Sequence, residues 1–282
     1  MSMRGPMSYS AVLFAATCMA ALCTIRTPAW AQPLPPCGTD EIAHATVSRV
    51  EDGRTFMLTD GREVRLAGIE VPLVPQESTG AISGGVTTKD ALTAKVQSKE
   101  VALRRAEIAS DRYGRLVAYV YAQTGRNDEN FVQGDLVAAG LARVGSRIGS
   151  PACATALVQR ETAARTARLG LWADPYYAVL DGGTPAKLLA QKGRFTLVEG
   201  KVVSVRESGA TIYLNFSRRW SEGFAVTVLK RNERNFSAAG IDLRHLAGRR
   251  VLVRGFIEAR GAAGSPRIEA DGPEQIETAN RD

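Results

Sequence analysis

Histidine, cysteine and aromatic residues are scarce in this chain of 282 residues. It contains two histidines, His44 and His245, four cysteines, and 6% aromatic residues. Two distant histidines argue against a histidine-rich zinc site and against a paired-histidine mechanism. The absence of a Cys-x-x-Cys pair gives no indication of a redox-active site. The chain also lacks the run of ~20 apolar residues that a membrane-spanning helix requires.

The overall composition is that of a globular protein. Hydrophobic residues make up 45% of the chain and charged residues 23%, with 27 glycines and 12 prolines. These values exclude collagen, a coiled coil, and a chain too polar to form a core. The length suggests about two domains. A net charge of +7 favours anionic partners such as nucleic acid or phospholipid surfaces, although basic exported proteins often bind neither.

The first 31 residues have the pattern of an export signal. Arg4 precedes an apolar run from 11 to 23, and the small residues Ala29 and Ala31 follow. This order predicts a secretory signal peptide cleaved after Ala31. The alternative, a membrane anchor, needs a longer apolar run. We therefore predict an exported protein, periplasmic or secreted, with no integral membrane span after cleavage.

Cleavage of the signal would leave two cysteines in the mature chain. Cys18 and Cys23 lie within the signal, so Cys37 and Cys153 remain. Two cysteines in an exported protein usually pair, and we expect a disulfide between them. The alternative is two free thiols.

The segment from 38 to 177 alternates short β-rich runs with turns and later contains helical patterns. Asp60-Gly61 is typical of a hairpin turn, because both residues tolerate the positive φ that tight turns need. Gly140 and Gly170 are suited to end helices. We predict an α+β domain with five strands, compatible with a small barrel. The expected strands cover 45–47, 55–58, 63–69, 101–103 and 116–121, and the expected helices 87–96, 131–139 and 152–169.

A second, mainly β domain is predicted over 194–279, after a linker at 178–193. The linker is expected because Asp181-Gly182-Gly183-Thr184-Pro185 is rich in turn residues. Aromatic residues alternate with polar ones in the second domain, a pattern typical of core packing; they are Phe195, Tyr213, Phe216 and Phe256. The expected strands cover 195–205, 211–216, 224–229, 250–257 and 267–270.

Four ordered blocks of sequence resemble the staphylococcal nuclease (thermonuclease) family. The resemblance extends over about 42–177 and implies an oligonucleotide-binding (OB) barrel capped by three helices. The first strand of the second domain, Gly200 to Val205, weakly resembles another OB strand. The four blocks are Val50–Phe56, Val64–Pro72, Asp111–Ala118 and Arg168–Trp172.

The resemblance implies that Arg65 and Arg115 grip a phosphate. Both positions are arginine here, and a guanidinium offers phosphate a planar fork of donors that stays charged. Arg112 and Tyr113, in the same turn as Arg115, are candidate binding residues. The structural alternative is that each arginine pairs with a local acid on the rim of the barrel.

The metal and base positions depart from the family pattern. The family reads Asp-Gly-Asp-Thr, whereas Arg54 here replaces the second aspartate, a calcium ligand. Asp52 and Glu70 remain as candidate metal ligands, but calcium prefers six to eight oxygens and a guanidinium repels it. Leu73 stands where the family has its glutamate base, and Glu77 on the same loop is a distant substitute. We predict that Arg54 acts as an internal cation paired with Glu70.

Three functions remain open from the sequence. The first is an exported, catalytically degenerate family member that binds single-stranded DNA, RNA or another polyanion. The second is an active metal-dependent nuclease with a rebuilt site, and the third is an envelope scaffold with a protein partner. No cofactor is expected for a degenerate protein. If nuclease activity is retained, calcium is the expected cofactor. Basic and aromatic residues at 218–220 and 230–234 resemble those of single-strand binders, but also solvated loops.

Overall fold

The computed structural model describes residues 1, 37, 38, 40–71, 87–124, 129–219, 221–260 and 264–278. The chain divides into two compact units, and the second, Leu34–Asp282, contains the fold described below. The predicted signal peptide and the loop carrying Leu73 and Glu77 lie outside the described residues. Within the described ranges, no helix has the length and apolar character needed to cross a membrane.

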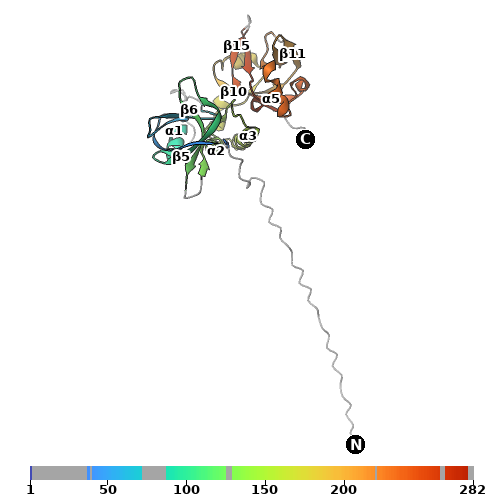
Figure 1. Cartoon of the computed structure of the whole chain (residues 1–282). Helices are drawn as coiled ribbons and strands as arrows, with labels where there is room; N and C mark the ends of the chain where they lie inside the picture. The colour runs from blue at the N-terminus through green and yellow to red at the C-terminus, as the bar shows by residue number, and fades with distance from the viewer. Residues whose placement is uncertain are drawn as a thin grey trace. The chain divides into compact units, whose positions relative to one another are not determined.

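The first half is built on a six-stranded sheet with the order β3-β2-β1-β5-β6-β7. Two of its strands, β5 and β6, are labelled in Figure 1. A parallel pairing of β3 with β6 links the strands β3, β2, β1, β5 and β6 into a ring. The α+β class is confirmed, but the sheet has six strands rather than five, because β7 pairs with the end of β6. The strands are β1 (Glu41–Val50), β2 (Thr55–Leu58), β3 (Glu63–Leu66), β5 (Glu100–Ser110), β6 (Leu116–Gln123) and β7 (Glu129–Phe131), with β4 (Ile69–Glu70) and β8 (Arg143–Val144) paired separately.

Three helices accompany this sheet, as predicted: α1 (Thr88–Val96), α2 (Val132–Ala138) and α3 (Pro151–Thr166). Thr87 and Asp90 form a capping box that starts α1. Gly140 follows α2 with φ +69°, and a Cβ there would lie 2.2 Å from the carbonyl oxygen of Leu169, so only glycine fits. The third helix ends three residues before the predicted end, because the chain turns at Arg168, which has φ +53°.

A disulfide joins Cys37, just before β1, to Cys153 in α3. Their Cα atoms are 5.0 Å apart, and both side chains are buried. The predicted pairing is confirmed. The two cysteines belong to the core of the first half, which also contains Phe56, Leu103 and Leu136.

The second half contains two sheets, ordered β17-β14-β10-β9 and β11-β12-β13-β16-β15. The predicted strand 195–205 is two strands, because the ladder is interrupted at Val202 and Val203. The strands are β9 (Leu180–Asp181), β10 (Phe195–Lys201), β11 (Ser204–Ser208), β12 (Thr211–Asn215), β13 (Ala225–Leu229), β14 (Arg250–Phe256), β15 (Glu258–Arg260), β16 (Ser265–Glu269) and β17 (Ile276–Thr278). The helices are α4 (Pro185–Leu189) and α5 (Glu233–Ala238), with 3-10 turns η2 (Gly170–Ala173), η3 (Pro175–Tyr177), η4 (Lys230–Asn232), η5 (Leu243–Leu246) and η6 (Pro273–Gln275).

The segment expected to be a linker carries structure of its own. Leu180 pairs in parallel with Val198 of β10, and α4 follows. Gly182 approaches the ring of Phe216 so closely that a Cβ would lie 2.9 Å from it. This segment is therefore packed onto the second half.

The core prediction for the second-half aromatics is correct in one case and wrong in another. Phe216 is buried, and it packs on Phe224 with ring centroids 4.8 Å apart. Phe256 is 47% exposed. The alternation of Phe256 with polar neighbours in the sequence could not show that this face of β14 is exposed to solvent.

Two arginines connect the halves. Arg254 of β14 is buried and forms an ion pair with Glu161 of α3. Arg143 of β8 donates hydrogen bonds to the carbonyl oxygens of Phe195, at 2.7 Å, and Tyr177, at 3.4 Å. Its guanidinium also lies 5.0 Å from the ring centre of Tyr177.

Candidate phosphate site

Arg54, Glu70 and Arg65 form a chain of charges on one side of the barrel. Arg54 directly precedes β2, and its backbone N–H donates to the Asp52 carboxylate at 2.8 Å, which fixes the turn. The Arg54 side chain donates from Nη1 to Oε2 of Glu70 at 2.7 Å. Arg65, on β3, reaches Oε1 of the same carboxylate at 3.3 Å. The predicted pairing of Arg54 with Glu70 is confirmed.

The turn between β5 and β6 supplies Arg115 and its partner Asp111. Asp111 is almost fully buried, and its Oδ2 accepts a 2.7 Å hydrogen bond from Nε of Arg115. Its Oδ1 accepts from the backbone N–H groups of Tyr113 and Arg115. Arg65 Nη1 lies 3.8 Å from the same carboxylate, so Arg65 and Arg115 belong to one network. Parallel pairing of Arg65 with Val117 places the two strands side by side.

Arg112 and Tyr113 lie at the outer edge of this network. Tyr113 is 68% exposed. The guanidinium of Arg112 lies 4.8 Å from the centre of its ring, and that of Arg115 lies 5.3 Å away. The ring of Tyr113 is therefore exposed to solvent and lies close to two cations.

The burial of the network shifts its proton equilibria. Burial raises the pKa of Glu70 above its ordinary value, although the charges of Arg54 and Arg65 act against the shift. Burial and the nearby Arg54 charge lower the pKa of Arg65. For Asp111, burial acts to raise the pKa, but hydrogen bonds from Arg115 and the Tyr113 N–H outweigh it, and the pKa is lowered.

The residues present do not fit the calcium ion that the family resemblance implies. Both oxygens of Glu70 face guanidinium groups, and Asp52 is the other candidate carboxylate. Arg54 brings a positive charge to the position of the missing ligand. Calcium needs six to eight oxygens, and here it would have to displace two cations. Within the described ranges, no group of three or more acidic, histidine or cysteine side chains is placed to hold a metal.

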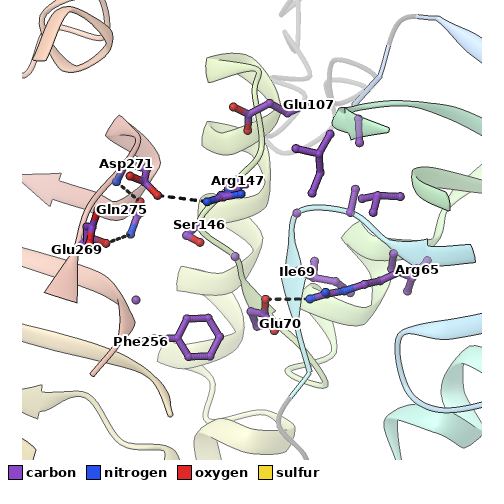
Figure 2. A pocket seen from close by; sticks show the side chains of 18 of the residues that line it. Arg65, Ile69, Glu70, Glu107, Ser146, Arg147, Phe256, Glu269, Asp271 and Gln275 are labelled. Carbon is purple, nitrogen blue, oxygen red and sulfur yellow. Dashed lines mark hydrogen bonds and ion pairs between the residues drawn. The ribbon is translucent and has the colours of Figure 1, made fainter. Parts of the chain in front are cut away.

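Two clefts meet at Glu70 and Phe256, which line both. The first, of about 460 Å³, contains Arg65 and Arg147 and is called the acidic cleft here because of its five carboxylates. Figure 2 shows it, with Phe256 on one side and the Arg65–Glu70 pair on the other. The second, of about 450 Å³, contains Arg54 and Arg194 and is called the aromatic cleft.

Sequence reasoning missed the residues of the aromatic cleft. Tyr176 lies in a 3-10 turn, Arg194 directly precedes β10, and Phe256 ends β14. Arg143 also lies in this cleft, with its pKa lowered to about 10 by burial. The one available signal was the paired Tyr176-Tyr177 and Arg194-Phe195 at either end of the expected linker.

Comparison with known proteins agrees with this geometry. Residues 63–174 match the family model described as "Staphylococcal nuclease homologue". An "Uncharacterized endonuclease" of Escherichia coli O157:H7 is 31% identical over 134 residues, which are 46% of this chain and 78% of that protein. A "Micrococcal nuclease" of Shigella flexneri is 30% identical over 167 residues, 57% of this chain and 85% of that protein.

These matches place the chain among nuclease-type proteins. It belongs to the staphylococcal nuclease family. The family match starts at residue 63, so Asp52 and Arg54 lie outside the matched segment.

Proposed function

We propose that this protein is an exported, catalytically degenerate member of the family that binds single-stranded nucleic acid through Arg65 and Arg115. The observation that carries the proposal is the 2.7 Å bond between Arg54 and Glu70. The side chain of Arg54 provides the positive charge that a bound metal ion would otherwise provide. Its ion pair also occupies the Glu70 carboxylate, which a metal would need as a ligand. Hydrolysis then has neither a metal nor the family's glutamate base.

Arg65 is the arginine best placed to take a phosphate. The nearest carboxylate oxygen, Oε1 of Glu70, lies 3.3 Å from Nη2 of Arg65, which is at the long end for a hydrogen bond. Oδ2 of Asp111 lies 3.8 Å from Nη1. Arg54 holds Glu70 more closely, at 2.7 Å. Arg65 is a quarter exposed, so its donors remain open to a phosphate oxygen. A phosphate would therefore compete with weak contacts rather than strong ones.

Further features of the protein support parts of the proposal. The N-terminal sequence pattern and the Cys37–Cys153 disulfide favour export to an oxidising compartment, periplasmic or extracellular. An OB-like fold for the second half is supported by the parallel pairing of β13 with β16 and the antiparallel pairing of β10 with β14. Only Val202 and Val203 separate β10 from β11, so these can be regarded as one bent strand.

An active nuclease with a rebuilt site is the second candidate. It is favoured by the two relatives, which are named as an endonuclease and a micrococcal nuclease, and by the retained Arg65, Arg115 and Glu70. In this case Glu77 would be the first residue to test as a base.

The experiment measures hydrolysis and binding of labelled single-stranded DNA and RNA by the purified chain Gln32–Asp282, with calcium, magnesium or chelator. The proposal expects no cleavage, and binding that weakens with salt because phosphate contacts release counterions. Arg65→Ala and Arg115→Ala should each weaken binding about tenfold.

Two outcomes contradict the proposal. Metal-dependent cleavage that disappears in both arginine variants would establish the active nuclease. Neither cleavage nor binding would leave the third function, a scaffold for a protein partner.

A further inference from the structure

The two clefts that meet at Glu70 and Phe256 have opposite charge. The acidic cleft contains two arginines against five carboxylates, and the aromatic cleft contains three arginines against one carboxylate. Arg65 itself lines the acidic cleft beside Glu70, and a nucleic acid strand bound there can extend along either cleft. Electrostatics favour its continuation into the aromatic cleft and oppose the acidic one.

The walls of the aromatic cleft are suited to a base. Phe256 is 47% exposed and packs edge-on against Phe195, with ring centroids 5.4 Å apart. Tyr176 is 39% exposed and is held edge-on against the buried Tyr177 at 4.9 Å. Each exposed ring thus packs edge-to-face with a second ring. Aromatic faces of this kind stack with any base.

Arg194 provides the cleft with an uncommitted cation. Its guanidinium lies 4.8 Å from the ring centre of Tyr176. Arg54, Arg65 and Arg115 all contact carboxylates, but among the described residues Arg194 has no acidic partner. Arg194 is exposed, so it can bind a phosphate without displacing an internal ion pair.

We propose that the aromatic cleft is a nucleotide subsite. A base stacks on Phe256 or Tyr176, and its phosphate is held by Arg194, with Arg54 at the end of the cleft. Phe256 and Arg194 come from the second half of the chain, so this half completes a binding groove that begins at Arg65. The inference rests on the proposed function, because it extends the same strand-binding site.

The test measures the affinity of a short fluorescein-labelled oligo(dT) for the chain Gln32–Asp282 by anisotropy at low salt. Arg194→Gln and Phe256→Leu should each weaken binding about tenfold, a loss typical of one phosphate contact or one stacked base. Arg147→Gln is the matched control. It removes the same charge, but from the acidic cleft, and should change affinity less than twofold.

A competition arm distinguishes a free nucleotide from a strand. Displacement of the probe by 5′-dTMP, but not by thymidine or inorganic phosphate, would show that the subsite takes a single nucleotide. Displacement only by unlabelled oligo(dT) would show that it takes a nucleotide within a strand. In both cases Arg194→Gln should raise the competitor concentration needed to displace half of the bound probe.

The controls separate the failure of this inference from failure of the proposed function. If wild type binds and Arg65→Ala weakens binding while Arg194→Gln and Phe256→Leu do not, the subsite is refuted and the proposed function stands. Equal losses in Arg147→Gln and Arg194→Gln would also refute it, since the effect would then follow net charge alone. If wild type does not bind oligo(dT), both fail.

Discussion

Arg254 and Glu161 form an ion pair that is out of contact with solvent. Nη1 of Arg254 lies 2.8 Å from Oε2 of Glu161, and the two side chains are 1% and 0% exposed. Arg254 also donates to the carbonyl oxygen of Val144 and pairs with Glu277, while the other Glu161 oxygen accepts the N–H of Val144. The pair connects α3 of the nuclease-type half with β14 of the second half.

Arg254→Met should therefore destabilise the protein by about 3–5 kcal/mol. The substitution leaves Glu161 buried without its counter-charge, which costs more than the pair itself contributes. Denaturant unfolding of the purified chain measures the loss. Arg250→Met is the matched control on the same strand. Its arginine is 62% exposed and 3.2 Å from the exposed Glu199, so the change should stay within about 1 kcal/mol.

The Cys37–Cys153 disulfide should account for a large part of the stability. It closes a loop with a sequence separation of 116 residues, for which the chain-entropy model gives about 4–5 kcal/mol. The double variant Cys37→Ser/Cys153→Ser should lose about this amount in denaturant unfolding. Reductant should destabilise wild type but leave the double variant unchanged. Titration of two free thiols in the unreduced, unfolded chain Gln32–Asp282, which contains only these two cysteines, would contradict the pairing.

Removing Arg54 should make stability more dependent on pH. The folded-state pKa of Glu70 is raised, mainly by burial, so its contribution to stability is fully present below the unfolded value of 4.5 and is lost as pH rises through the folded pKa. Arg54→Gln removes a counter-charge and raises that pKa further. The destabilisation of this variant should be small at pH 4 and grow to about 2 kcal/mol at pH 7. That loss lies between those expected for breaking a surface ion pair and a buried one.

Denaturant unfolding at several pH values checks this, with Arg54→Lys as the variant that keeps a cation. A carbon-detected NMR titration of Glu70 gives the pKa directly. A destabilisation in Arg54→Gln that is the same at pH 4 and pH 7 would mean that Arg54 does not hold the charge of Glu70.

Arg54→Asp should give the site an affinity for calcium that wild type lacks. The change removes the resident cation and adds a carboxylate beside Asp52 and Glu70. Calcium at saturating concentration should raise the Tm of the variant by about 3 °C or more relative to chelator. Wild type and the Arg54→Asn control should show no shift. A calcium-dependent shift in wild type would contradict the poor fit of this site to calcium.

The local features of the first half could be predicted from sequence. The Asp60-Gly61 hairpin, the cap of α1 at Thr87 and the helix end at Gly140 are encoded by residues within a few positions of one another. Arg54 and Glu70 are also close in sequence, and the family resemblance, which places both at one metal site, was enough to predict their pairing. The end of α3 was placed too late, because the turn at Arg168 depends on the close packing of Gly140 against Leu169.

The sequence by itself determined the barrel strands, the three helices, the disulfide and the set of charges at the candidate phosphate site. Tertiary structure decided which charges remain free and which aromatics remain exposed. Arg254 and Glu161 are far apart in the chain, and only packing of the two halves removes both from water. Phe256 and Arg194 face a cleft because residues of both halves form its walls. Burial is set by elements distant in sequence, so local patterns could not give it.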